Sequence, residues 1–305
     1  MTSQSTAPRP STGILLGVGA YVIWGLLPLY FKLLGTVPAT QVLAHRILWS
    51  VLLLAAIVLL LKRGRAIRAA ARGRTLLLLA ASAFLIAVNW LVYIWAVQNG
   101  HVLEASLGYF INPLVNVALG VTVLGEKVRR VQWVAVAIAG LGVAIMTASG
   151  GGAIWISLVL AFSFGTYGLL RKIATIDALG GLFVETILLA PFACAVLVLA
   201  SAQGNAAFGH DRGLDALLVL AGAVTAIPLL MFAAAARRMP YTALGLLPYI
   251  GPTLQFALAV FLFGEPLHRT DMLTFALIWI GLAIYAVDGL RVARGMRLEE
   301  ALQRA

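Results

Sequence analysis

Residues 113–145 read PLVNVALGVTVLGEKVRRVQWVAVAIAGLGVAI, and residues 252–284 read PTLQFALAVFLFGEPLHRTDMLTFALIWIGLAI. Aligned without a gap so that Pro113 falls on Pro252, they are identical at 11 of 33 positions. The matches include the proline that opens each stretch and a Gly-Glu pair in its middle. Self-similarity at a fixed spacing indicates a duplicated architecture, so the chain is predicted to consist of two related halves.

Both stretches are strongly apolar, and so is the chain around them. Of its 305 residues, 62% are hydrophobic and only 11% are charged, and the mean hydropathy is +1.00. Soluble domains carry roughly 25% charged residues. The composition therefore predicts an integral membrane protein. The net charge of +11 does not indicate nucleic-acid binding, because no basic face on a soluble segment accompanies it.

Apolar runs long enough to cross a bilayer recur along the whole chain. We expect ten transmembrane helices, at 13–33, 39–61, 74–98, 103–124, 131–149, 153–170, 179–200, 213–236, 241–263 and 270–288. Residues 13–149 form the predicted first five-helix repeat and 153–288 the second, with an N-terminal segment at 1–12 and a basic tail at 289–305. An odd number of spans in each half makes the two repeats inverted relative to each other.

The positions of the basic residues predict the orientation. With the N-terminus in the cytoplasm, 18 of the 22 Lys and Arg residues lie at cytoplasmic ends or tails. Cytoplasmic loops carry the Lys and Arg excess in membrane proteins. Both termini are therefore expected in the cytoplasm.

Inverted repeats suit alternating access, because one packing of the halves can be exchanged for its mirror image across the membrane. The sequence thus predicts a secondary transporter; the competing interpretation is an old duplication kept for stability alone. Polar and aromatic side chains that share helical faces within the spans are the candidate lining of a substrate cavity. They are Tyr21, Trp24, Asn89, Trp90, Tyr93, Tyr109, Asn112, Asn116, Ser163, Tyr167, Tyr249 and Gln255. Hydrogen bonding between helices is the alternative role for these residues.

Five prolines are expected to interrupt or loosen the spans near this cavity. They are Pro28, Pro113, Pro228, Pro248 and Pro252.

Charged side chains at depth form a third group, predicted to act as gates. We expect Arg46 and Lys32 to meet Glu104 in an outer gate, and Glu185 to pair with Lys172 or Arg171 in an inner gate. The alternative is that these long side chains reach the interface without a functional role. His45 and Glu185 are the candidate groups for proton coupling, and neither is central, so facilitated diffusion or exchange is an equal expectation.

Several function classes are disfavoured by missing motifs. The spans contain no HExxH, no Gly-x-Ser-x-Gly and no acidic pair at helical spacing, so an enzyme is not expected. A single cysteine, Cys194, excludes an intrachain disulfide and multi-cysteine metal sites. We expect no cofactor and no metal.

Several short blocks resemble the RarD-type proteins of the EamA family, within the drug/metabolite transporter superfamily. The most specific is the run LEASLGYFINPL at 103–114. The others are YxxWGxxPxYFK at 21–32, HRxxWS at 45–50, Asn89-Trp90 and YIGPT at 249–253. The resemblance extends from about Gly13 to Asp288.

The resemblance implies two EamA repeats, a location in the bacterial inner membrane, and export of a small organic metabolite, of the amino-acid kind, or of a drug. A lipid or lipid-linked head-group flippase is the runner-up, because Lys32 and Arg46 could hold a phosphate. The expected partners are a small-molecule substrate and membrane lipids, with no nucleic acid. A chain with both repeats needs no second copy to complete its pathway, so a monomer is expected.

Overall fold

The computed structural model describes residues 10–149, 153–236, 238 and 247–304, and within these ranges the chain is helical with no strand. Nine of the helices described are long and apolar enough to span a membrane, and a shorter apolar segment covers Leu247–Leu262. The prediction of an all-α membrane protein is confirmed. The expected N-terminal segment before residue 10 and the expected start of the ninth span at 241 lie outside the described residues.

The helix bounds follow the predicted spans to within a few residues. The first half contains α1 (Pro10–Leu33), α2 (Ala39–Leu60), α3 (Gly64–Ala70), α4 (Gly73–Gln98), α5 (Val102–Leu124) and α6 (Arg130–Ala148). The second contains α7 (Ile154–Ile173), α8 (Ala178–Ala202), α9 (Arg212–Ala236), η1 (Leu247–Tyr249), α11 (Ile250–Ala257), η2 (Leu258–Leu262) and α12 (Arg269–Arg304). The short α3 was not predicted, and α12 continues through the basic tail as one helix.

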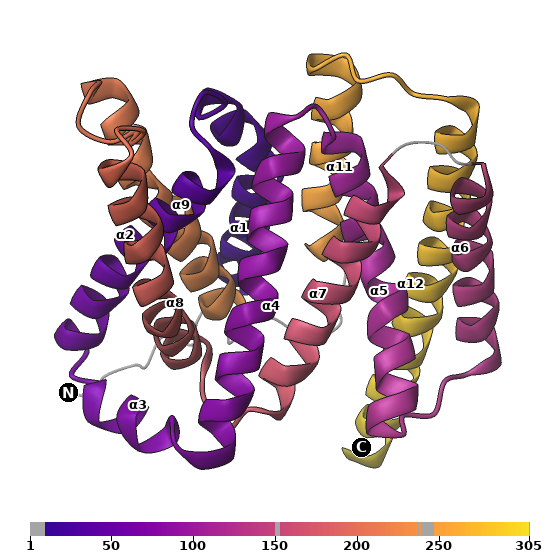
Figure 1. Cartoon of the computed structure of the whole chain (residues 1–305). Coiled ribbons are helices and arrows are strands. Elements are labelled where there is room, and N and C mark those ends of the chain that lie inside the picture. The colour runs from indigo at the N-terminus through magenta and orange to yellow at the C-terminus, as the bar shows by residue number, and fades with distance from the viewer. Residues whose placement is uncertain (1–9, 150–152, 237, 239–246, 305) are drawn as a thin grey trace.

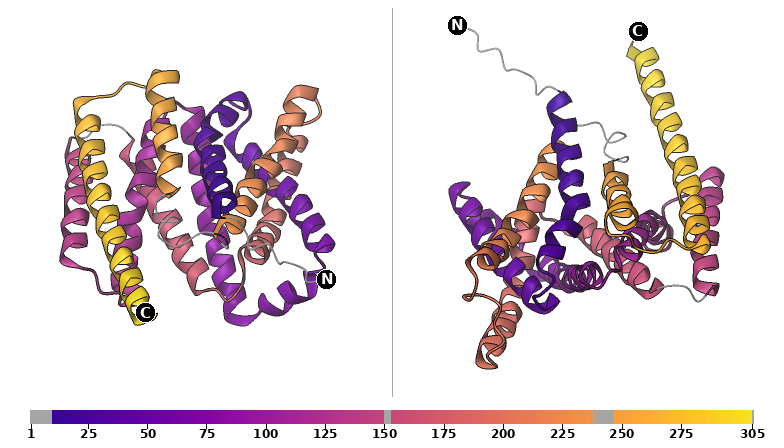
Figure 2. Two further views of the ribbon diagram at one scale, coloured as in Figure 1. Left: turned by 180° about the vertical axis from the view of Figure 1, so that it is seen from behind. Right: turned by 90° about the horizontal axis from the view of Figure 1, so that it is seen from above.

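The helices stand side by side in one bundle (Figure 1), with α2, α8 and α9 at one flank and α6 and α12 at the other. Figure 2 shows from above that α1 and α11 lie between these flanks. The packing is the same for the two halves. Helix α1 contacts α9 and α11, as α7 contacts α4 and α5, while α2 packs on α8 and α6 on α12. Exchanging the halves leaves this set of contacts unchanged, as a two-fold relation between the repeats requires.

Glycines at equivalent positions allow close contacts between helices. A Cβ atom on Gly142 would lie 3.0 Å from the carbonyl oxygen of Thr274. One on Gly281, the equivalent glycine of the second half, would lie 2.6 Å from the carbonyl oxygen of Ala135. Small residues let membrane helices approach closely and gain van der Waals contact. The α6–α12 flank therefore depends on the absence of a side chain at both glycines.

The repeated Gly-Glu pair has a structural explanation. Gly125 and Gly264 have φ of 67° and 65°, a left-handed conformation that favours glycine at a helix end. The amide of the following glutamate then donates back across the turn, from Glu126 to the carbonyl of Gly120 and from Glu265 to that of Ala259, at 2.9 Å each. The same turn ends both spans.

The two glutamates differ in what their carboxylates do. Glu265 accepts hydrogen bonds from the backbone amides of Val102 and Leu103 at 2.9 and 2.7 Å, and so caps α5 from the other half of the chain. Glu126 instead forms an ion pair with Lys172 at 2.8 Å. The halves therefore carry the same residues with different partners at the two ends of the bundle.

The expectation that proline breaks the spans is corrected at three positions. Helices α1, α5 and α9 continue through Pro28, Pro113 and Pro228. Proline is tolerated inside membrane helices when neighbouring helices and local adjustment satisfy the freed carbonyl. Only the segment with Pro248 and Pro252 is irregular, since a 3-10 turn precedes α11 and a π-helical stretch follows it.

We expect Gly281→Ala to destabilise the protein by about 1–3 kcal/mol, because the added methyl group overpacks the α6–α12 contact. Gly140→Ala is the matched control, since nothing lies within 4 Å of a Cβ there. The measurement is thermal unfolding of both variants in detergent. Equal melting temperatures for the two would contradict the close approach of these helices.

Candidate functional site

Two charged residues at equivalent positions of the halves lie inside the bundle, Arg46 on α2 and Glu185 on α8. They fall on each other in the alignment that pairs Pro113 with Pro252, and their helices pack together. Their exposed fractions are 5% and 0%. A charged side chain within a membrane span is costly unless it is paired or faces a cavity. The groups around Arg46 and Glu185 must therefore compensate for the burial of these two charges.

The guanidinium of Arg46 is held by one hydrogen bond and two aromatic rings. Its Nε donates to Thr225 Oγ1 on α9 at 2.7 Å. The guanidinium carbon lies 4.1 Å from the ring centroid of Trp90 and 5.8 Å from that of Phe31. Cation–π contacts of this kind are stronger when the cation is shielded from water. Thr225 and the rings together fix the plane of the guanidinium.

Tyrosine hydroxyls complete the surroundings of Arg46. Tyr30, Tyr93 and Tyr109 lie within electrostatic range of the guanidinium. The rings of Tyr93 and Tyr109 are 5.7 Å apart, edge to face. Tyr93 is 2% exposed, and its hydroxyl has no hydrogen-bond partner among the described residues. A buried hydroxyl without a partner costs free energy. A ligand that accepts a hydrogen bond from the Tyr93 hydroxyl would remove this cost.

Glu185 has protein partners on three sides. Its Oε1 accepts from Ser82 Oγ on α4 at 2.6 Å and lies 3.6 Å from Arg171 Nε on α7. Its Oε2 lies 3.4 Å from the Tyr167 hydroxyl, also on α7. The predicted pairing of Glu185 with Arg171 is therefore present. These distances show the ion pair and do not by themselves assign it a role as a gate.

The partners of the two charges also correspond between the halves. Phe31, under Arg46, falls on Arg171, beside Glu185, when α1 is aligned with α7 so that Gly25 meets Gly165. Thr225 and Ser82 come from α9 and α4, which are equivalent helices. Duplication has thus produced a cationic cluster with aromatic walls in one half and an ionic cluster in the other.

The predicted outer gate is not assembled in the structure, and this is a correction. Glu104 lies 3.4 Å from His101 and accepts from the amide of Ala153, while Lys32 Nζ stands 5.2 Å above the ring of Phe263. Glu104 occupies the first turn of α5, where the helix dipole favours a carboxylate. Arg46, about two turns into α2, is directed to Thr225 instead.

The remaining gate candidates have partners of their own. His45 stacks on Phe208 with ring centroids 5.2 Å apart. Lys172 forms its ion pair with Glu126, so of the two alternatives for Glu185 the structure selects Arg171.

Several residues predicted to line a cavity instead connect helices. Asn89 Nδ2 donates to the carbonyl of Leu160 and to Ser163 Oγ on α7 at 3.1 and 3.0 Å. Its Oδ1 accepts from the Tyr109 hydroxyl at 3.2 Å. These bonds join α4, α5 and α7. They favour the interhelical role that the sequence left open for Asn89 and Ser163.

A side-chain hydrogen bond also joins α11 to α1, the pair of helices that corresponds to α5 and α7. Gln255 Nε2 donates to the carbonyl of Trp24 on α1 at 3.2 Å, while its Oε1 is buried without a partner among the described residues. Tyr21 packs edge-on against Trp24 and Phe232. This aromatic cluster joins α1 to α9.

Tyr109, Asn112 and Asn116 are expected to share one face of α5, and this face packs along α7. The amide oxygens of Asn112 and Asn116 would lie 3.2 and 3.3 Å from a Cβ atom on Gly165. Asn112 Oδ1 is buried without a partner in the described part of the chain, whereas Asn116 is an exposed residue. Of these α5 residues, only Asn112 has a buried side-chain oxygen without a partner in the described part of the chain.

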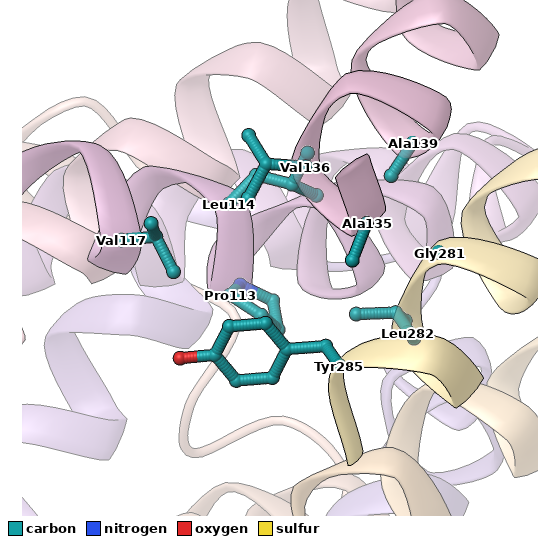
Figure 3. Close-up of a pocket in the computed structure, with 9 residues that line it drawn as sticks. All are labelled: Pro113, Leu114, Val117, Ala135, Val136, Ala139, Gly281, Leu282 and Tyr285. Carbon is teal, nitrogen blue, oxygen red and sulfur yellow. The ribbon is translucent and has the colours of Figure 1, made fainter. Parts of the chain in front are cut away.

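Two cavities lie to one side of these residues. Figure 3 shows a crevice between α5, α6 and α12 lined by apolar residues and Tyr285. Its volume of about 10 Å³ is no more than a single water needs. A larger cavity of about 360 Å³ lies between α5, η1, α11 and α12. It is lined by Phe110, Tyr249, Thr253, Trp279, Leu282, Ala283 and Ala286, so Tyr249 is the one member of the predicted set in it.

Sequence reasoning missed Thr225, Ser82 and the capping role of Glu265. A hydroxyl inside a span gives no sign of its partner, because Ser and Thr often bond to their own helix, as Thr225 also does with Ala221. Glu265 could have been identified, since the repeated Gly-Glu pair was already visible and a carboxylate after a helix end can cap the next one.

The sequence of this chain is similar to those of several bacterial transporters. Residues 11–148 match the family model described as the EamA-like transporter family. An uncharacterized transporter of Pseudomonas aeruginosa is 48% identical over 284 residues, covering 92% of this chain and 95% of that protein. Protein RarD of Escherichia coli K12 is 44% identical over 290 residues, covering 94% and 98%.

More distant similarities agree with these. A chloramphenicol-sensitive protein RarD of Pseudomonas aeruginosa is 33% identical over 287 residues, covering 92% of this chain and 96% of that protein. A crystal structure with 19% identity superimposes with a TM-score of 0.60 and covers 92% of this chain and 99% of that one. The last similarity supports the fold alone.

Asn89→Leu is expected to destabilise the protein by about 1–2 kcal/mol, because it removes three interhelical hydrogen bonds of about 0.6 kcal/mol each. Thr122→Val is the control and should leave the melting temperature unchanged, since that exposed hydroxyl bonds only to the carbonyl of Ala118 in its own helix. Thermal unfolding in detergent measures both. If Asn89→Leu unfolds at the wild-type temperature, the interhelical interpretation of this amide is wrong.

Proposed function

Since the chain belongs to the EamA family of transporters and has RarD proteins among its relatives, we propose that it exports a small organic metabolite or drug from the bacterial cell. It is a multi-pass membrane protein, and its bacterial relatives support a place in the inner membrane. We further propose that both termini are cytoplasmic, as the distribution of Lys and Arg predicts.

The observation that carries the proposal is the equivalence of contacts between the halves. Helix pairs that pack in one half have counterparts in the other, and the α2–α8 and α6–α12 pairs are their own counterparts. A structure built this way can exchange the roles of its two ends with little change in the sum of its contacts. This is the arrangement that alternating access uses, with the substrate site between the repeats.

Under this proposal the two ends are closed by different contacts in the state described. At one end Glu265 caps α5. At the other, Glu126 binds Lys172, and Glu185 binds Arg171 and Ser82. We assign the Glu185–Arg171 pair to the inner gate. Breaking a buried ion pair by removing one partner leaves an unpaired charge and costs several kcal/mol, so the gate should depend strongly on Glu185.

No single described residue identifies the gradient that drives transport. Glu185 is already paired and His45 is stacked on an aromatic ring. Proton coupling, exchange and facilitated diffusion are therefore to be distinguished by the gradient that drives release from the proteoliposomes.

A lipid or head-group flippase is the second candidate. The cavity of about 360 Å³ between α5, α11 and α12 is the observation in its favour, because its apolar lining suits a lipid chain. The described residues that line it include no charged side chain, whereas a head group with a phosphate needs a cation. The export of a soluble metabolite or drug is therefore preferred.

The function is tested in proteoliposomes loaded with labelled amino acids, organic acids or chloramphenicol, and in a parallel set with dye-labelled lipids. We expect at least one soluble compound to be released and Glu185→Gln to reduce its initial rate by roughly tenfold or more. Asp177→Asn, which breaks an exposed ion pair with Arg63, is the matched control and should transport normally. Movement of lipids alone would favour the flippase, and a normal rate for Glu185→Gln would remove Glu185 from the mechanism.

A further inference from the structure

The end of the Arg46 side chain is available for a ligand. Its Nε is occupied by Thr225, but Nη1 and Nη2 donate no hydrogen bond to any described residue. Neither of these nitrogens is among the fully buried atoms that lack a partner, in contrast to Nη1 of Arg171. In a side chain that is only 5% exposed, the Nη edge is therefore the part that remains accessible.

Arg46 also differs from the other buried charges. Three side chains with a full charge are buried in the described part of the chain, Arg46, Glu185 and Asp271. Glu185 has Arg171 at 3.6 Å and Asp271 has His268 at 3.2 Å. No carboxylate among the described residues lies within 4 Å of Arg46. A buried guanidinium with no anionic neighbour is unsatisfied until an anion reaches it.

We propose that Arg46 binds the carboxylate of the transported molecule, so that the substrates of this protein are carboxylate-bearing small molecules. This inference rests on the proposed transport function and names the substrate class for it. It also replaces the predicted role of Arg46 in an outer gate.

The geometry selects a carboxylate among anions. Trp90 and Phe31 lie against the guanidinium, and Thr225 accepts from its Nε, which leaves the two parallel N–H groups of the Nη edge. That edge forms two parallel hydrogen bonds with a planar carboxylate. One guanidinium balances one negative charge. A phosphate, with a charge near −2 at neutral pH, would retain about one uncompensated charge in the bilayer interior.

Tyr93 supplies a second, independent indication of a ligand. Its hydroxyl is buried and has no partner in the parts of the chain described, and its ring packs 5.9 Å, centroid to centroid, from Phe31, the ring that lies against Arg46. A carboxylate on the Nη edge offers lone pairs beyond the two that the arginine uses. The Tyr93 hydroxyl can donate to one of them. Binding would then satisfy both the unpaired guanidinium and the unpaired hydroxyl.

The test is ligand-dependent melting of the purified protein in detergent with benzoate, phenylacetate and phenylalanine, each against its amide, and with inorganic phosphate. We expect at least one acid to raise the melting temperature saturably while its amide and phosphate do not. Arg46→Gln should abolish the shift, and Arg46→Lys should raise the Kd roughly tenfold, because a lysine cannot form the bidentate pair. Arg63→Gln, which removes a distant exposed arginine, should respond as wild type.

Tyr93→Phe keeps the test decisive if Arg46→Gln does not fold. The lost hydroxyl has no partner among the described residues, so the variant should fold with wild-type stability yet bind the acid with a larger Kd. The inference is overturned if the amides bind as well as the acids, if phosphate replaces them, if Arg46→Gln responds as wild type, or if no acid shifts the melting temperature.

Transport of an amide in proteoliposomes, independent of Arg46, would overturn this inference and leave the proposed function standing. Absence of transport for every soluble compound would instead remove the proposed function itself.

Discussion

A charge buried inside a membrane protein has to be balanced by a partner, and this constraint explains most of what is unusual in this bundle. Glu185 meets it with Arg171, Ser82 and Tyr167, three groups on two helices. Arg46, its counterpart in the other half, meets it only in part, with a hydroxyl and two aromatic rings. The duplicated fold thus holds one satisfied and one unsatisfied charge at equivalent places, and the unsatisfied one is where we infer that a substrate binds.

The same duplication governs the packing. Gly142 and Gly281 admit the backbone of the opposite helix, and Gly25 and Gly165 leave room for side chains of α11 and α5. Contacts that correspond between the halves hold them together, while Glu126 and Glu265, which have different partners, show where the symmetry is broken. A transporter that alternates between two states needs both properties, a shared frame and end contacts that differ.

The sequence predicted the positions of the spans and the duplication, because apolar length and an internal repeat are local or linear signals. It predicted that Glu185 pairs with Lys172 or Arg171, and the structure places Arg171 beside Glu185. It was wrong about Glu104 with Arg46 and about breaks at Pro28, Pro113 and Pro228. Which way a polar side chain faces depends on helix rotation, and this is why Asn116 is exposed while Asn89 joins three helices.

Alternation of the two ends is the central claim, and distances between spin labels test it most directly. With Cys194 replaced by alanine, one label pair joins Ala202 and Arg269 at the end with the Glu265 cap, and another joins Thr175 and Lys127 at the end with the Glu126–Lys172 pair. We expect the acid that raises the melting temperature of the purified protein to shift the two distance distributions in opposite directions. Distances that stay fixed at both ends, or that lengthen together, would contradict it.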